Sequence, residues 1–530
     1  MPTLSVSKTE SPLTVGETFS FTFVSDEPLA PNPFADVIIT ATFGGIPVNG
    51  FCDDPTGQTF TVRFRPDEPG PVSYSVRLQA ANTTVEYNGT FDVQEAPADA
   101  PYEGPLDVEG EIFRYRRSRR AFVWNSFTAY MLMGLSPTAR TAALQSFADS
   151  GVTRLRVSLT PSRQLSGARW DEPNVVESPD FTFRYGPFLC ANPDDTLNPG
   201  SDPTRFDPDY FQRFEAMLTE ARALGIHVQV VCFTDAQEDQ NYPFDRDSTA
   251  DPNERRFYEY VIARLASFPN VEWCITNEWA LFRPDEWVNA IGEIFRTQDP
   301  YRQLCSVHGH GRFPFAAQPW CTHTLFQIWD EHGGPRWGKR IRAEWAAQGT
   351  VGPIVNEEFG YEDHGPTQWG EGRPRAARSA EALSRQLWEL FMVGIHATTG
   401  DSPVSSNGGW VNGAGVPPTA PLRRRHQIWT EFLARFDWPR TVPTDGLADG
   451  DAYVRAIESE LYVVYVPNGG THAVRLPNSG PWTVDAFDPA TGTVTRLATD
   501  ATLTLDPYAG PGFLTPTRPF GVAWAYLIRA

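Results

Sequence analysis

The chain has 530 residues, enough for three or four average domains or for one large barrel with smaller neighbours. Its 16 Trp, 17 Tyr and 35 Phe exclude a disordered chain, and no apolar run reaches the roughly 18 residues that a membrane span needs. With 44 basic and 65 acidic residues the net charge is −21, which argues against a nucleic-acid partner because an acidic surface repels phosphates.

The six cysteines contain no Cys-x-x-Cys pair, and three of them lie in apolar runs. Free, buried thiols and a reducing compartment are therefore expected. The N-terminal sequence MPTLSVSKTESPLTVGE lacks the basic and apolar regions of a secretory signal. We expect a cytoplasmic location, or a secreted one if a leader has been removed.

Residues 1–97 are expected to form a β-sandwich. Short segments of alternating hydrophobicity recur there, such as FSFTFV, DVIITATF, TFTVRFRP and VSYSVRL, and Gly, Pro, Asn and Asp separate them. The polar sequence APADAP follows and is typical of a stiff linker.

Residues 102–438 alternate between apolar strand-like runs and amphipathic helical stretches, which predicts a (β/α)8 barrel. A doubly wound sheet is the alternative, but it usually carries a Gly-rich phosphate turn after its first strand, and none follows FVWNSF. The eight strand candidates are FVWNSF, TRLRVSL, IHVQVVCF, VEWCITN, QLCSVHG, HTLFQIW, PIVNEE and IHATTG. The predicted helices are 137–151, 208–225, 253–270, 284–300, 336–349, 379–394 and 422–436.

Residues 441–530 again have the pattern of short β-strands, with LYVVYV, WTVDAF and AWAYLI among the segments. A second β-sandwich is expected, so the whole chain is an α/β protein: a (β/α)8 TIM barrel flanked by two β-sandwich domains. The expected role of the sandwiches is structural, either covering barrel faces or mediating contacts in a homo-oligomer.

Two strands of the predicted barrel end in carboxylates. Strand four ends in Asn277-Glu278, and strand seven ends in Glu357-Glu358. The active site of such a barrel lies at the C-terminal ends of its strands, and strands four and seven stand on opposite sides of the ring. Two carboxylates about 5 Å apart are what a retaining glycosidase needs, one as a protonated acid and one as an ionised nucleophile.

Glu358 and its neighbour Glu357 compete for the strand-seven role. Side chains alternate along a strand, so only one of the two is expected to point toward the barrel axis. The sequence leaves the choice open, and Glu362 is a more remote candidate.

These motifs resemble clan A of the glycoside hydrolases, which includes cellulases, mannanases and β-galactosidases. The resemblance lies in Asn-Glu at the end of strand four and Glu-Phe-Gly at the end of strand seven. It implies that Glu278 is the general acid/base, that Asn277 binds the sugar 2-hydroxyl, and that Glu358 is the nucleophile.

The ends of the chain resemble the neighbours of apiosidase-like barrels. Asn32-Pro33-Phe34 with the strands that follow is similar to an uncharacterised N-terminal β-sandwich found before such barrels. LYVVYVPNGG and the run 487–492 (FDPATG) resemble a C-terminal module named after collagen binding, a name that implies no collagen here. The resemblance thus covers nearly the whole chain.

Several further side chains are candidates for substrate binding, and for each a packing or surface role is the alternative. Arg156 lies inside strand two, where a buried guanidinium usually pairs with a carboxylate and could keep the nucleophile ionised. The tryptophans could stack on sugar rings, and the polar side chains at strand ends could bind hydroxyls. These candidates are Trp279, Trp329, Trp410, Gln327, Asn125, Asp235 and Asp401.

The sequence His308-Gly309-His310 ends strand five and invites a metal interpretation. Barrels that use His-x-His as metal ligands carry it on the first strand, so we favour hydrogen bonding of substrate by His310 and expect no metal or other cofactor.

The leading expectation is a retaining glycoside hydrolase that acts with two glutamates on a carbohydrate substrate. Exo action on a terminal sugar of a plant or microbial oligosaccharide or polysaccharide is favoured, because long segments after strands two (160–205) and eight (401–420) could close a cleft. The alternatives are an endo-acting glycanase, a non-catalytic carbohydrate-binding protein on a degenerate barrel, and a metal-dependent hydrolase that uses the two histidines.

Overall fold

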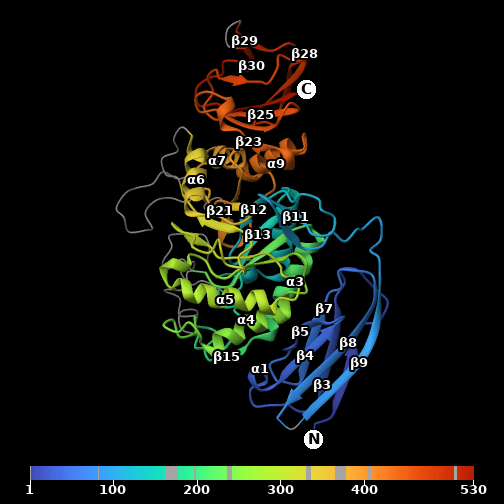
Figure 1. Ribbon diagram of the computed structural model, residues 1–530. Helices are drawn as coiled ribbons and strands as arrows, with labels where there is room; N and C mark the ends of the chain where they lie inside the picture. Colours follow the sequence, from blue (N-terminus) through green and yellow to red (C-terminus); the bar gives the residue numbers. More distant parts are fainter. Residues whose placement is uncertain are drawn as a thin grey trace.

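The computed structural model describes residues 2–81, 83–160, 177–195, 199–234, 242–329, 336–363, 378–403, 408–506 and 510–530. The chain forms an elongated molecule in which a barrel separates two β domains, and the two termini lie at opposite ends (Figure 1). The predicted fold class, a TIM barrel flanked by two β domains, is confirmed.

The N-terminal domain consists of two sheets that pack face to face. In β3 the side chains of Phe19, Phe21 and Phe23 are buried and alternate with more exposed residues, as expected for a strand with one face toward a core. Phe19 stacks on Phe91 of the other sheet with ring centroids 4.2 Å apart. One sheet contains β1 (Leu4–Lys8), β3 (Phe19–Ser25), β7 (Thr59–Phe64) and β6 (Phe51–Cys52), and the other contains β2 (Leu13–Thr14), β9 (Thr83–Gln94), β8 (Gly70–Ala80), β4 (Ile38–Phe43) and β5 (Ile46–Asn49); the short helix α1 (Pro33–Asp36) precedes β4.

The central domain is a closed parallel barrel. Strand five is divided into β18 (Cys305–Ser306), which pairs with β17, and β19 (Gly309–His310), which pairs with β20. These two pairings close the ring, so the nine short strands occupy the eight strand positions of the barrel. The other seven positions are occupied by β12 (Asn125–Thr128), β13 (Arg154–Ser158), β16 (His227–Val231), β17 (Val271–Cys274), β20 (Thr324–Gln327), β21 (Ile354–Glu358) and β22 (Ile395–Thr399).

Seven of the helices surround the barrel, and local sequence sets where several of them begin. Asp207 and Asp251 each precede a proline, and their carboxylates accept hydrogen bonds from the backbone N–H groups of the first turn. The fully described connection 311–323 contains no helix. The helices are α2 (Pro137–Asp149), α3 (Pro208–Ala223), α4 (Pro252–Leu265), α5 (Asp285–Gln298), α6 (Trp337–Gln348), α7 (Ala380–Met392) and α9 (Pro421–Leu433).

A hairpin that the sequence analysis missed covers the N-terminal end of the barrel. It consists of β10 (Leu106–Glu109) and β11 (Ile112–Tyr115). Phe113 of this hairpin is fully buried and stacks on Trp124 with ring centroids 4.3 Å apart. It also contacts the rings of His323 and His396, which lie where two other strands begin. The bottom of the barrel is therefore plugged by aromatic side chains.

The C-terminal domain again contains two sheets, whose core includes Tyr462, Val464, Trp482 and Tyr526. The larger sheet contains β23 (Val442–Pro443), β24 (Tyr453–Ile457), β25 (Leu461–Val466), β31 (Trp524–Arg529), β27 (Trp482–Phe487) and β28 (Val494–Ala501), and the smaller contains β26 (Ala473–Arg475), β30 (Gly510–Leu514) and β29 (Thr504–Asp506). Short helices occur at η1 (Leu132–Gly134), η3 (Trp279–Leu281), α8 (Gly409–Asn412), η4 (Trp438–Arg440) and η5 (Asp445–Leu447).

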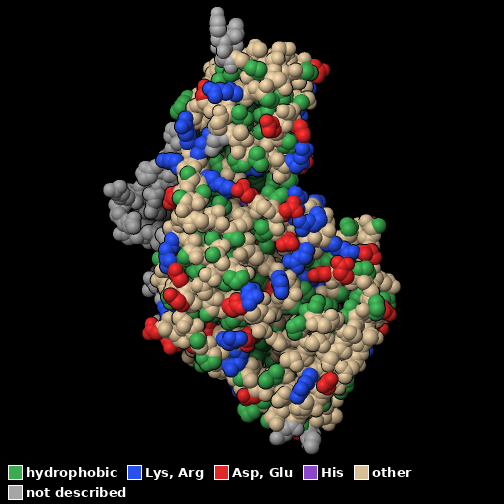
Figure 2. Space-filling view, in the orientation of Figure 1, with side chains coloured by type: hydrophobic (Ala, Val, Ile, Leu, Met, Phe, Trp, Pro, Cys, Tyr) green, Lys and Arg blue, Asp and Glu red, His purple; other side chains and the backbone are tan. Residues whose placement is uncertain are grey.

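Both β domains are attached to the barrel by polar contacts as well as apolar packing. Arg63 of the N-terminal domain pairs with Glu215 of α3 at 2.9 Å. At the other end, Trp388 of α7 stacks on Tyr465 with ring centroids 5.3 Å apart. Acidic and basic side chains are interspersed on the face shown in Figure 2. In the described part of the chain no helix is long and apolar enough to cross a membrane.

All six cysteines carry free thiols, and only Cys190 is not fully buried. This confirms the expectation of free, buried thiols.

Candidate active site

The strand-four carboxylate Glu278 sits in a strained backbone position at the mouth of the barrel. It follows β17 and precedes η3, with φ 46° and ψ 43°, in the left-handed region that non-glycine residues rarely adopt. Such a conformation costs on the order of 1 kcal/mol or more and persists only where the surroundings impose it. The side chain is nearly buried, with 5% of its surface exposed.

A buried ion pair braces the segment after Glu278. Arg283 donates its backbone N–H to Trp279 of η3, at 2.9 Å. Its guanidinium pairs with Glu254 of α4 at 3.3 Å and also donates to backbone carbonyls of the segment 245–248. Both charged side chains are at most 4% exposed. The loops after strands three and four are thereby held together next to Glu278.

Strand seven contains a β-bulge exactly where the two candidate nucleophiles lie. Phe326 pairs with Asn356, but the next residue, Gln327, pairs with Glu358, so Glu357 is the extra residue. The expectation from strict alternation, that only one glutamate faces the axis, is therefore wrong. Both carboxylates reach Arg156, each at 3.4 Å.

Glu357 is a fully enclosed carboxylate that pairs with an arginine. Its Oε1 lies 2.6 Å from Nη2 of Arg154, and its Oε2 accepts a hydrogen bond of 2.9 Å from Thr398. None of its surface is exposed. Arg154 also pairs with Glu272 of β17, so one arginine joins two glutamates inside the barrel.

Glu358 lies one layer higher and receives donors of a different kind. Its Oε1 accepts hydrogen bonds from the hydroxyls of Tyr130, at 2.8 Å, and Tyr361. Arg156, fully buried on β13, contacts the same oxygen at 3.4 Å. The prediction that Arg156 pairs with a carboxylate is confirmed. Three donors around one oxygen suit an anion.

The two tyrosines are site residues that the sequence analysis missed. Burial and the neighbouring Glu358 carboxylate raise the pKa of Tyr361 well above its ordinary value, so its hydroxyl stays protonated and remains a donor. Tyr130 lies two residues after β12, at the C-terminal side of the barrel. Inspecting the residues just beyond each strand, and not only the last ones within it, would have found both.

Asn277 is oriented by the arginine that contacts Glu358. Its Oδ1 accepts a hydrogen bond of 3.0 Å from Nη2 of Arg156 and is also contacted by Nδ1 of His308. Because these neighbours occupy the oxygen, the amide nitrogen is the end directed away from them. Arg156 thus links the motif of strand four to that of strand seven.

Aromatic rings form a wall beside Glu358. Trp410 stacks on Tyr361 with ring centroids 4.8 Å apart, and Trp329 contacts the same tyrosine edge-on at 5.3 Å. Trp410 is only 3% exposed, so it mainly supports the tyrosine. Trp329 is half-buried and offers more free surface to a ligand. Gln327 lies on the strand next to Glu358, and its buried Oε1 has no hydrogen-bond partner among the described residues.

Asn125 is not at the mouth, contrary to the sequence prediction. It begins β12 instead of ending it, because strand one starts three residues later than FVWNSF suggested. Its amide donates to the carbonyl of Gly151 at 2.8 Å, and its Oδ1 contacts His426 of α9 at 2.9 Å. Asn125 therefore joins the strand to the surrounding helices.

Trp279 and Asp401 also have packing roles. Trp279 is fully buried and packs edge-on against Phe315 at 4.9 Å, so it does not line the pocket. Asp401 is buried in an ion pair with Arg423 of α9 at 2.9 Å. Asp235 lies outside the described residues. So does the side chain of His310, whose backbone belongs to β19.

The surroundings of His308 do not favour a metal ion. Its Nδ1 lies 3.1 Å from the guanidinium of Arg156, and a permanent positive charge at that distance repels a cation. Among the described residues, no three His, Cys, Asp or Glu side chains are grouped so that they could hold a metal.

Part of the barrel is similar to a family of known catalytic domains. Residues 172–404, which include Glu278 and Glu358, match the family described as "Apiosidase-like, catalytic domain". This part of the chain, just under half of it, is therefore similar to that family.

Solved structures share the fold. A Bacteroides vulgatus protein provisionally named a glycoside hydrolase is 22% identical, with a TM-score of 0.76 over 98% of this chain and 99% of its own. A glycoside hydrolase family 5 protein of the same organism is 14% identical, with a TM-score of 0.60 over 81% of this chain and 94% of its own. No curated protein matches the sequence.

Proposed function

We propose that this protein is a retaining glycoside hydrolase that uses Glu358 as nucleophile and Glu278 as general acid/base. The observation that carries this assignment is the environment of Glu358, an anion-binding arrangement of Arg156 and two tyrosine hydroxyls at the end of strand seven. Glu278 ends strand four, across the ring.

The reaction proceeds by double displacement. Glu358 attacks the anomeric carbon while Glu278 gives its proton to the departing glycosidic oxygen. Glu278 then takes a proton from water, which attacks the anomeric carbon and releases Glu358. Asn277, held by Arg156, presents its amide nitrogen to the hydroxyl next to the anomeric carbon.

Exo action on the terminal sugar of a plant or microbial oligosaccharide is the favoured mode. Tyr361, Trp410 and Trp329 wall one side of the site, which suits a pocket that ends at one sugar unit. Endo cleavage would need a groove open on both sides of the scissile bond.

The test is hydrolysis of a panel of nitrophenyl glycosides and plant oligosaccharides by the wild type, Glu278→Gln and Glu358→Gln. Hydrolysis that both changes reduce by orders of magnitude would support the assignment. Glu357→Gln is the matched control: activity lost there and kept in Glu358→Gln would move the nucleophile. Release of the product with inverted anomeric configuration, detected by proton NMR, would exclude the retaining mechanism.

A further inference from the structure

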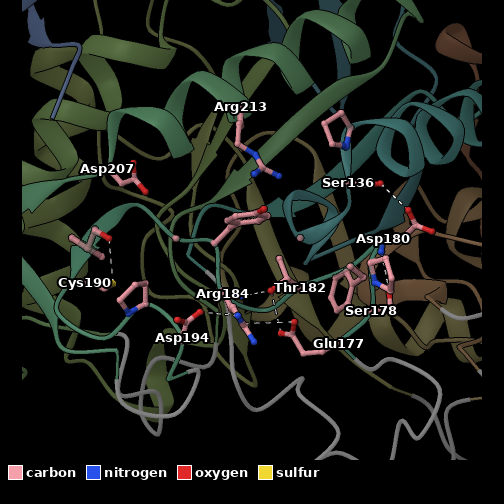
Figure 3. A pocket seen from close by; sticks show the side chains of 18 of the residues that line it. Ser136, Glu177, Ser178, Asp180, Thr182, Arg184, Cys190, Asp194, Asp207 and Arg213 are labelled. Atoms are coloured by element: carbon pink, nitrogen blue, oxygen red, sulfur yellow. Dashed lines mark hydrogen bonds and ion pairs between the residues drawn. The ribbon is translucent and has the colours of Figure 1, made fainter.

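A cavity lies on the C-terminal side of the barrel, in the insertion after strand two. Its volume is about 900 Å³, within the range of small-molecule sites. The segment 177–195 closes it against the starts of α2 and α3, as Figure 3 shows. The hairpin of β14 (Phe188–Cys190) and β15 (Ser201–Phe206) continues this wall. At one edge of the cavity Ser136, which caps α2, donates a hydrogen bond of 3.1 Å to Asp180 (Figure 3).

The cavity shares a piece of backbone with the active site. Gly134, the last residue of η1, lines the cavity, and its carbonyl accepts the backbone N–H of Thr182 at 2.9 Å. Tyr130, whose hydroxyl contacts Glu358, lies four residues earlier on the same connection. A ligand in the cavity and a sugar at Glu358 would therefore contact the same loop.

One wall of the cavity presents an aromatic ring and an unused donor. Tyr185 is 39% exposed, and the guanidinium of Arg213 lies 3.7 Å from its ring centroid, which fixes the ring from one face. Nε of Arg213 is buried and has no acceptor among the described residues. A buried donor without a partner is costly, and a ligand hydroxyl would satisfy it.

The charges of the cavity select against anions. Four acidic side chains line it, against the two arginines, Arg184 and Arg213. Arg184 is already paired with Asp194 at 2.8 Å. Glu177, Asp180 and Asp207 each accept a hydrogen bond from a protein group. Their other oxygen can accept from a neutral hydroxyl, whereas carboxylate, sulfate or phosphate groups would be repelled. The acidic residues are Glu177, Asp180, Asp194 and Asp207.

We propose that this cavity binds neutral sugar units of an oligosaccharide beyond the scissile bond, with Tyr185 as the stacking platform. The assignment rests on the proposed function, because exo cleavage at Glu358 leaves the rest of the chain on the leaving-group side. Aromatic faces combined with carboxylate and guanidinium groups match the alternating apolar and hydroxyl surfaces of a pyranose ring.

Binding is tested in the Glu358→Gln background by calorimetry with neutral gluco-, manno- and xylo-oligosaccharides of two to six units and with an oligogalacturonide. Tyr185→Ala is expected to weaken the binding of the longest neutral chain that binds by about 10-fold, which is about 1.4 kcal/mol. Arg213→Lys, which keeps the charge but loses the Nε donor, is expected to weaken it less. Phe520→Ala, which removes an aromatic side chain that is 92% exposed in the C-terminal domain, is the matched control and is expected to leave binding unchanged.

Three results would overturn the assignment: no binding of any neutral oligosaccharide, equal weakening of short and long chains by Tyr185→Ala, or tighter binding of the oligogalacturonide. Its failure is distinguishable from failure of the proposed function. Hydrolysis that survives Glu358→Gln would refute the catalytic assignment. The effect of Tyr185→Ala on the binding of long chains is measured by calorimetry without turnover, so it tests the cavity separately.

Discussion

Glu357 and Glu358 are neighbours in the chain, yet they belong to two different layers of the barrel interior. In the lower layer Glu357 and Glu272 surround Arg154, and none of these charges reaches solvent. In the upper layer Arg156 and two phenol groups surround Glu358, which keeps 5% of its surface exposed. The same residue types thus form a sealed ion pair below and an accessible anion above.

The difference teaches that partner type and access, more than residue type, separate a structural carboxylate from a reactive one. Glu357 uses one oxygen for arginine and the other for Thr398. The described contacts of Glu358 converge on its Oε1, so in the proposed mechanism Oε2 is the oxygen that attacks the sugar.

The largest expected effect is on catalysis, at the upper layer. Glu358→Gln is expected to lower kcat by about 10³-fold or more, because it removes the proposed nucleophile while keeping the shape. Steady-state kinetics on the best substrate of the panel, with circular dichroism as the check on folding, measure it. A glutamine variant with near wild-type kcat would contradict the division into two layers.

A substitution in the lower layer is expected to change the stability of the fold. Glu357→Gln should lower the free energy of unfolding by about 3 kcal/mol, because Arg154 and Arg156 lose a buried counter-charge. Urea denaturation of both glutamine variants gives the comparison. A larger loss of stability in Glu358→Gln than in Glu357→Gln would reverse the roles assigned to the two layers.

A buried carboxylate that is held by hydrogen bonds sharpens the contrast. Glu389 of α7 accepts hydrogen bonds from Tyr453 of the C-terminal domain and from the backbone of Gly338. Burial raises its pKa from 4.5 to about 7. The folded state therefore binds this proton more tightly than the unfolded state, and stability is lost as pH rises from about 4.5 through 7.

The shift corresponds to a stability difference of about 3 kcal/mol between pH 4.5 and pH 8. Glu389→Gln is expected to remove this contribution, so the variant should gain stability relative to wild type at pH 8 but not at pH 4.5. Urea denaturation at both values measures it. Equal effects of the substitution at the two values would show that Glu389 titrates normally.

The smallest expected effect comes from a single donor of the upper layer. Tyr361→Phe removes one hydrogen bond to Glu358 and should lower kcat by about 10- to 100-fold, since a hydrogen bond to a charged group contributes about 1.5–3 kcal/mol. Tyr465→Phe, which removes a phenol hydroxyl buried far along the chain in the C-terminal domain, is the control. Equal kcat values for the two variants would remove Tyr361 from the site.

Much of this arrangement could be predicted from local patterns. Apolar runs that alternate with amphipathic helices predicted the barrel, and the strand-end rule pointed to Glu278 and Glu358. The position of Arg156 inside strand two predicted its pairing with a carboxylate. These features depend on short stretches of sequence, where periodicity is informative.

The remainder depends on contacts between distant segments. The bulge at Glu357 carries no Gly or Pro that would mark it, and one extra residue overturns the alternation argument. Asn125 was misplaced because strand boundaries are uncertain by a few residues. Tyr130 reaches Glu358 across 228 positions of the chain, a proximity that no local pattern contains.

The aromatic plug beneath the barrel has a consequence for the order of events in catalysis. Because Phe113 and Trp124 fill the lower end, the described part of the barrel leaves its C-terminal end as the route to and from Glu358. In a double displacement the departing sugar chain and the incoming water would share that route. The shared route would then impose an order on the two steps. The first product would have to leave before hydrolysis of the glycosyl-enzyme begins, so slow departure of a long chain would delay the second half of the cycle.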